Sequence, residues 1–284
     1  MGKNNRRFIF FLRSRRQVVA FLFVMILLGS CSLKWWYEQS DWIMLWRIDL
    51  YFDLDRNQSN KVESRLKDLL HQHRKQIVPE HLKFLRGIQE RAGDKLSDQE
   101  IKWFLEEVQR QYQLIVQHIV HDVALFYSSL TPEQINYYEK EVLKDNEKHE
   151  EILRLSVDER QQKKAERTTE TLSDWFGGFS DEQEKLIKQQ LVTLPDTYEE
   201  WYSQRLDRQR IFLLYLREQK GPQILENTLR GWFLNKTFFR FMDNPNMIKV
   251  FHNIDDLVTA QQRKHFLDKV QTWIDDFSAL TNQK

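Results

Sequence analysis

The side chains best suited to metal or acid–base chemistry are eight histidines: His71, His73, His81, His118, His121, His149, His252 and His265. His118 and His121 stand three residues apart with Asp122 beside them, so on a helix they share one face and are the candidate metal ligands. A solvent-facing pair has the same spacing and is the commoner arrangement, whereas His71 and His73, two apart, point to different faces. We therefore predict no metal site and no other cofactor, with His118 and His121 as the pair to examine.

The chain lacks the motifs of common enzyme classes. No histidine follows a glutamate by three residues, as di-iron helices require, and no His-Glu-x-x-His, Gly-x-Ser-x-Gly, P-loop or Gly-x-Gly-x-x-Gly run occurs. From Glu139 to Glu170 carboxylates alternate with lysines and arginines, which is typical of one solvated, salt-bridged helix or of a partner-binding arm. We expect a non-enzymatic protein; a hydrolase without a recognisable motif is an alternative.

Cys31 is the only cysteine of 284 residues and ends an apolar run. The segment before it starts with basic residues and no acidic one, continues with the apolar stretch 18–28, and closes with two small residues, which are the parts of a secretory signal. An uncleaved membrane anchor is the alternative, but the apolar run 17–28 is shorter than the ~20 residues that span a bilayer.

The run Leu28-Gly29-Ser30-Cys31 resembles the lipobox of bacterial lipoproteins. The resemblance implies that a signal peptidase recognises Leu28, Gly29 and Ser30, and that Cys31 carries a diacylglycerol and an amino-terminal acyl chain such as palmitate. More than one acyl chain anchors a protein stably in a membrane. Ser32, where an aspartate would imply the inner membrane, implies the periplasmic face of the outer membrane. Lipidation would use the only thiol and exclude disulfide chemistry.

The charge balance does not favour nucleic-acid binding. The first thirty residues hold six of the 43 basic residues and no acidic one, so the rest of the chain has 37 basic and 42 acidic residues, a net charge of −5. A nucleic-acid binder needs a concentrated basic face. We expect partners of another kind, namely the membrane through the covalent lipid and a protein of the cell envelope.

The composition predicts an all-α fold, either an irregular multi-helix bundle or a superhelical stack behind a lipoprotein signal peptide. Glycine and proline number only 8 and 5, and apolar residues from Ile101 to Ile119 recur at steps of three and four. The predicted organisation is a signal peptide over 1–30, a Trp-rich membrane-proximal segment over 31–54, and a helical domain over 55–284. Gly177 and Gly178 mark a possible sub-boundary.

Five segments share a capping-box pattern, in which an apolar residue is followed by Ser, Thr or Asp and, three residues later, by Glu or Gln. They are Leu54-Asp55-Arg56-Asn57-Gln58, Leu96-Ser97-Asp98-Gln99-Glu100, Leu130-Thr131-Pro132-Glu133-Gln134, Phe179-Ser180-Asp181-Glu182-Gln183 and Val258-Thr259-Ala260-Gln261-Gln262. The pattern predicts helices that begin near residues 56, 98, 132, 181 and 260, and Leu130 with Ile135 can form a hydrophobic staple. Further helices are expected over 80–91, 196–219 and 222–234.

The third segment, Leu130-Thr131-Pro132-Glu133-Gln134, is similar to the signature of the LTxxQ family of periplasmic chaperones and envelope-stress sensors. The resemblance covers five residues. It implies, as an alternative function, the binding of unfolded clients on an apolar face.

Aromatic residues gather in two parts of the chain. Trp35, Trp36, Trp42 and Trp46 follow Cys31 closely, and they either contact the membrane surface, where tryptophan is favoured, or pack on the domain as a first core helix. The second group, from Trp201 to Phe251, is expected to be mostly core; several of its members exposed together would mark a binding groove.

A fuller resemblance spans most of the chain after Cys31. The stretches Tyr37 to Trp42, Asp49 to Leu54, Trp175 to Gly177 and Leu194 to Thr197 resemble an uncharacterised family of bacterial envelope lipoproteins. Because that family is a domain of unknown function, the resemblance implies a place in the envelope and no catalytic residue. We expect a membrane-anchored periplasmic lipoprotein that binds or scaffolds a partner.

Overall fold

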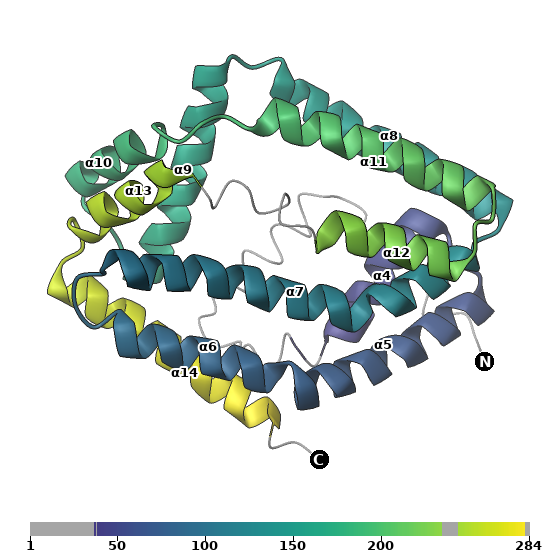
Figure 1. Cartoon of the computed structure of the whole chain (residues 1–284), viewed down its shortest axis with the longest axis horizontal. Helices are drawn as coiled ribbons and strands as arrows, with labels where there is room; N and C mark the ends of the chain where they lie inside the picture. Colours follow the sequence, from purple (N-terminus) through teal and green to yellow (C-terminus); the bar gives the residue numbers. More distant parts are fainter. Residues whose placement is uncertain (1–36, 38, 235–243, 282–284) are drawn as a thin grey trace, which may run out of the picture. The chain divides into compact units, whose positions relative to one another are not determined.

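The computed structural model describes residues 37, 39–234 and 244–281, and within them the chain forms helices and no strand (Figure 1). The prediction of an all-α, multi-helix fold is confirmed. The helices are α4 (Ser40–Phe52), α5 (Arg56–Gln76), α6 (Val78–Arg91), α7 (Asp98–Ser128), α8 (Pro132–Leu153), α9 (Val157–Phe176), α10 (Asp181–Leu191), α11 (Tyr198–Arg217), α12 (Pro222–Phe233), α13 (Pro245–Asp255) and α14 (Ala260–Thr281).

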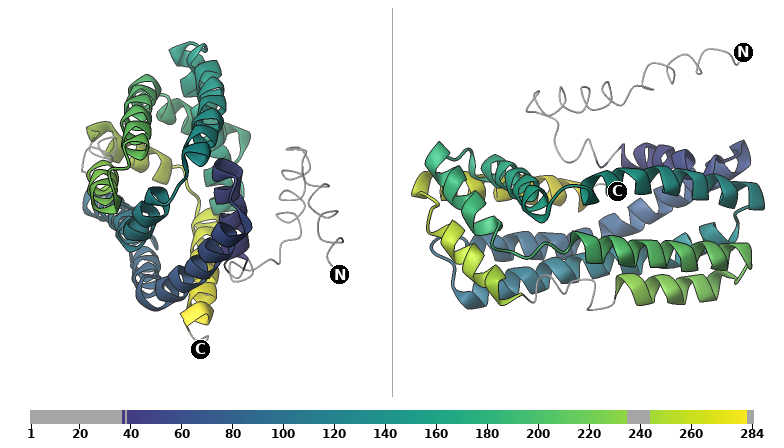
Figure 2. Two further views of the ribbon diagram at one scale, coloured as in Figure 1. Left: turned by 90° about the vertical axis from the view of Figure 1, so that its right-hand side faces the viewer. Right: turned by 90° about the horizontal axis from the view of Figure 1, so that it is seen from above.

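The chain divides into two compact units, Met1–Ser40 and Asp41–Lys284, and the helices pack within the second. There α7 lies against α12, α6 against α14, α9 against α10, and α8 against α11, as Figures 1 and 2 show. Helices far apart in the sequence, such as α6 and α14, are therefore direct neighbours.

The helices begin where the capping boxes predict. The observed first residues are Arg56, Asp98, Pro132, Asp181 and Ala260. At each start the side chain of the preceding Asp, Ser or Thr accepts a hydrogen bond from a first-turn amide, and the Glu or Gln three residues on accepts one in return. Leu130 and Ile135, the expected staple, are both buried. The helices expected over 80–91, 196–219 and 222–234 correspond to α6, α11 and α12.

The prediction of one helix from Glu139 to Glu170 is wrong. Helix α8 ends at Leu153, and a new helix, α9, starts at Val157. It has a sixth capping box, in which the side chains of Ser156 and Glu159 each accept a hydrogen bond from the other residue's backbone amide. The segment from Leu155 to Glu159 carries the same apolar–Ser–x–x–Glu signal as the other five, so the break was readable from the sequence.

Gly177 ends α9 in the left-handed conformation, with φ of 76°. A Cβ atom there would lie 2.7 Å from the ring of His265, so only glycine fits both the backbone and the neighbour. The two glycines thus form the connection between α9 and α10, and the sub-boundary suggested there stays a prediction.

Two clusters of buried apolar side chains stabilise the second unit. One joins α4, α7, α8, α11 and α12 and includes Phe52, Val120, Ile135, Phe212 and Leu225. The other joins α6 and α14 through Val78, Leu82, Leu85, Val270 and Ile274. Burial of each such side chain contributes about 1.5–3 kcal/mol relative to exposure.

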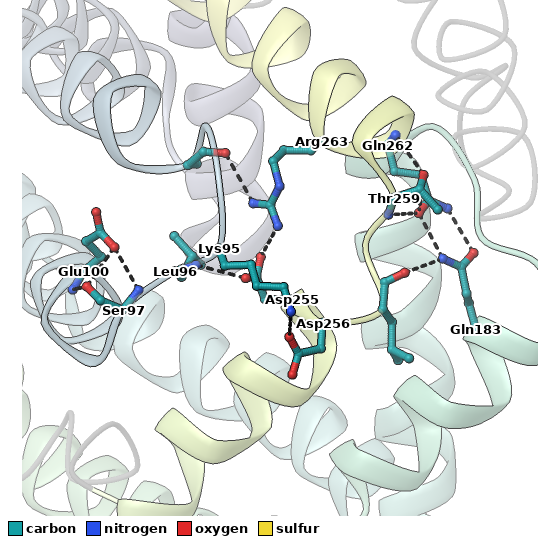
Figure 3. A network of polar contacts seen from close by, with 12 residues as sticks. Lys95, Leu96, Ser97, Glu100, Gln183, Asp255, Asp256, Thr259, Gln262 and Arg263 are labelled. Carbon is teal, nitrogen blue, oxygen red and sulfur yellow. Dashed lines mark hydrogen bonds and ion pairs between the residues drawn. The ribbon is translucent and has the colours of Figure 1, made fainter.

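The glutamines of four capping boxes bond each other in pairs. Gln183 and Gln262 exchange two amide hydrogen bonds of 3.0 Å, and their Nε2 atoms also donate to the carbonyl oxygens of Leu257 and Gly178, both at 2.7 Å (Figure 3). Gln58 and Gln134 exchange bonds in the same way, at 3.0 and 2.7 Å. Each pair ties two helix starts that lie more than 70 residues apart in the sequence.

Replacing Gln183 by glutamate is expected to lower the free energy of unfolding by about 1–3 kcal/mol. The glutamate keeps the oxygen that accepts from Ser180 N, but loses the donor that serves Gln262 and Leu257. Urea denaturation measures the change. The matched control is Glu159→Gln, at a capping box without a paired glutamine, which should change stability much less. Equal losses in the two variants would contradict a role for the pair.

Candidate functional site

The two histidines considered as metal ligands face different helices. His118 Nε2 lies 3.1 Å from the carbonyl oxygen of Leu69 in α5, so this nitrogen carries hydrogen and donates. His121 Nδ1 lies 2.8 Å from a carboxylate oxygen of Glu226 in α12. Within the described part of the chain, no three His, Cys, Asp or Glu side chains are placed to hold a metal ion.

His118 instead lies near two other histidines. Its ring centroid is 6.1 Å from that of His73, which lies 5.4 Å from that of His81, and His81 Nδ1 is 2.7 Å from Gln111 Oε1. Burial, together with His81 and His118, lowers the pKa of His73 to about 4, and burial also lowers the pKa of His81. This trio was not predictable from the sequence, because the turn between α5 and α6 brings His73 and His81 together and the packing of α7 adds His118.

The half-buried His73 and His81 predict that stability falls in mild acid. In the unfolded chain a histidine has a pKa of 6.5, whereas in the folded chain the pKa of His73 is about 4. Below pH 6.5 the unfolded chain therefore binds more protons than the folded chain, so acidification favours unfolding. With allowance for partial exposure, the loss at pH 5 is about 1–2 kcal/mol.

Urea denaturation of wild type and His73→Gln at pH 7.5 and 5.0 checks this prediction, because the variant should lose less stability on acidification. The control is His71→Gln, since His71 lies on the same helix but is exposed and should leave the pH dependence unchanged. Identical pH dependence in wild type and His73→Gln would contradict the prediction.

An open cleft of about 540 Å³ lies between α4, α7, α8, α11 and α12. Small-molecule sites occupy about 300–1,000 Å³. Its apolar and aromatic lining is Ile48, Tyr51, Phe52, Val123, Tyr127, Tyr138, Val142, Trp201, Phe212, Leu229, Trp232 and Phe233. Of the aromatic residues of the C-terminal half that the structure describes, Trp201, Phe212, Trp232 and Phe233 line this cleft, but only Trp201 is exposed, so the expectation that the group is mostly core fits better than a groove of exposed rings.

Three arginines also line the cleft, and within the described residues none of them forms an ion pair. Arg47 lies over the ring of Tyr51 and Arg205 over that of Trp201, at 6.0 and 5.9 Å from the centroids. The polar neighbours of Arg205 are the amides of Asn146 and Gln209 rather than carboxylates. Burial and the adjacent Arg205 lower the pKa of Arg208. Arg47, Arg205 and Arg208 therefore bring positive charge to the cleft, and Asp145 of the lining offsets part of the charge of Arg205.

The one carboxylate of the lining, Asp145, is already engaged. It accepts hydrogen bonds from the Tyr51 hydroxyl and from Lys148. Burial acts to raise the pKa of Asp145, but these two bonds bring it below its ordinary value. Asp145 thus links α4 to α8, and the nearby charge of Arg205 lowers the pKa of Asp145 further.

Two tyrosine hydroxyls add further donors. Tyr127 and Tyr138 line the cleft, and neither hydroxyl makes a hydrogen bond to another described residue. Burial raises the pKa of Tyr127 and raises that of Tyr138 to about 12, so both hydroxyls keep their hydrogen at neutral pH. The polar groups that the cleft offers are therefore mostly donors.

Helix α4 packs on the core by one face and exposes the other. Ile48, Tyr51 and Phe52 belong to or contact the first core cluster, whereas Trp42 is 58% exposed and Trp46 43%. The alternative in which these two tryptophans are core residues is therefore wrong. Residues four apart share a helix face, so Trp42, Trp46 and Leu50 form one exposed apolar row.

Several residues of interest lie outside the described part of the chain: Leu28, Gly29, Ser30, Cys31, Trp35 and Trp36. Among the helices that are described, none is both long enough and apolar enough to cross a membrane.

The fold and cleft define an all-α protein with an arginine-lined aromatic groove. Residues 50–238 match a family of unknown function, DUF6279, and the chain belongs to that family. The prediction of an uncharacterised family is confirmed. The matched range includes every residue of the cleft except Arg47 and Ile48. No curated protein and no solved structure matches the chain.

Proposed function

We propose that this protein is a lipid-anchored, non-enzymatic binding or scaffold protein of the bacterial envelope, held through Cys31 at the periplasmic face of the outer membrane. The observation that carries the proposal is that α4 serves two surfaces. Arg47 and Tyr51 line the cleft, while Trp42 and Trp46 form an exposed row that starts only 11 residues after Cys31. Tryptophan is favoured at the membrane–water boundary, so the row suits a helix beside a bilayer.

The anchor is tested by labelling cells with a palmitate analogue. The wild-type chain should incorporate the label and fractionate with the outer membrane, and Cys31→Ala should lose both properties. Ser32→Ala, which leaves the lipidated atom in place, should still incorporate the label. Full labelling of Cys31→Ala would overturn the proposed anchor.

A protein partner is tested by crosslinking in intact cells and purification of the full, anchored chain. One stoichiometric envelope protein in the purified material supports a scaffold. The open aromatic cleft also favours a second candidate, an LTxxQ-like chaperone or stress sensor that binds unfolded clients. That function requires the detergent-solubilised full chain to suppress aggregation of a denatured test protein, and absence of suppression would remove it.

A further inference from the structure

We propose that the cleft between α4, α7, α8, α11 and α12 binds a single-chain amphiphile with an anionic phosphate head, the phosphate on Arg205 and Arg208 and the hydrocarbon chain along the aromatic lining. This site goes beyond the proposed anchor and partner and does not depend on either. It concerns a ligand taken into the cleft, not the lipid attached at Cys31.

The charge of the cleft argues for an anionic group. Arg205 and Arg208 stand three residues apart on α11 and share its cleft-facing side with Trp201 and Phe212. Both guanidinium groups are half-buried and neither forms an ion pair with a described residue, although Asp145 attracts Arg205 at longer range. The two groups repel one another, and an anion between them would relieve that cost. Guanidinium groups bind phosphate oxygens in bidentate fashion, which makes a phosphate a fitting head.

The rest of the lining argues for a hydrocarbon chain rather than a peptide. The cleft walls are helices, whose backbone amides and carbonyls are already bonded within each helix. An extended peptide would find no strand edge to pair with and would leave its own backbone groups without partners. A hydrocarbon chain needs no hydrogen bond and gains from contact with Phe233, Leu229 and Val123.

The test uses the full chain, purified from membranes in a neutral detergent and examined by native mass spectrometry with three probes. Palmitoyl-lysophosphatidylglycerol has both chain and phosphate, monopalmitoylglycerol has only the chain, and glycerol 3-phosphate has only the head. We expect one bound molecule of the first probe, and no binding of the other two at the same concentration. Equally tight binding of monopalmitoylglycerol or of glycerol 3-phosphate would overturn the proposal.

Variants locate the bound probe. Arg208→Gln should weaken binding of palmitoyl-lysophosphatidylglycerol at least tenfold, whereas Arg210→Gln, an exposed arginine of α11 that pairs with Asp207, should not weaken it. Tyr138→Phe removes one hydroxyl donor of the cleft without disturbing the ring packing, and it should also weaken binding of the probe. This variant keeps the test valid if Arg208→Gln fails to fold. Unchanged binding in Arg208→Gln and Tyr138→Phe, or equal weakening in Arg210→Gln, would contradict the assignment.

Discussion

Replacing Arg160 by methionine is expected to lower the free energy of unfolding by about 3–5 kcal/mol. Arg160 Nη2 lies 2.6 Å from Asp196 Oδ2, and only 9% of the arginine side chain and 11% of the aspartate side chain are exposed. Removal of the guanidinium would leave a buried carboxylate without a charged partner, which is the costly way to break an ion pair.

Arg160 also joins three helix ends. Its Nη1 donates to the carbonyl oxygen of Leu155 at 2.7 Å and to that of Leu153 at 3.4 Å, just where α8 ends. Asp196, in turn, accepts from the amide of Tyr198 at the start of α11. The Arg160 side chain, in the first turn of α9, thus contacts both the end of α8 and the segment just before α11. Its loss should destabilise the packing of these three helix ends.

Urea denaturation of the variant measures the loss. Arg210→Met, which breaks an exposed pair with Asp207 within α11, should cost less than about 1 kcal/mol. The double variant Arg160→Met with Asp196→Leu should recover part of the loss, since it leaves no buried charge. A similar cost in Arg160→Met and Arg210→Met would show that burial of the pair contributes little.

The helix starts were predictable because their signals are local. A capping box satisfies amides within one turn of the same helix, so Thr131 and Gln134 identify the start of α8 from five residues. The same residues gave no sign of what lies across from them. Gln134 bonds Gln58, 76 residues away, and a glutamine that caps a helix without such a partner has the same local sequence.

The candidate site was predictable only in its parts. The aromatic residues of α11 and α12 were predicted to be core or groove, but no role was predicted for Arg205 or Arg208. Their position in a cleft depends on α8 packing against α11 and on α4 lining the same cleft, which local sequence does not encode. One sequence signal could have identified the two arginines as candidate site residues. The spacing of Trp201, Arg205, Arg208 and Phe212 places cations and large rings on one helix face.

Replacing Phe212 by alanine is expected to lower the free energy of unfolding by about 3–5 kcal/mol. The side chain is 5% exposed, and its ring centroid lies 4.6 Å from that of Tyr127 in α7 and 6.0 Å from that of Tyr138 in α8. Trp232 of α12 completes the contacts at 6.4 Å. One ring therefore holds α11 to three other helices, and its loss removes all three aromatic contacts at once.

The position of Phe212 beside the open cleft decides where in that range the loss should fall. Water can enter a cavity that adjoins the cleft, and Trp232 and Tyr138 have room to move into it, so we expect a value nearer 3 than 5 kcal/mol. Phe212→Leu, which keeps most of the volume, should cost about half as much. Leu214→Ala, on the same helix but 50% exposed, is the control and should cost less than about 1 kcal/mol. If Phe212→Ala were no more costly than Leu214→Ala in urea denaturation, α11 would be held to its neighbours by contacts other than this ring.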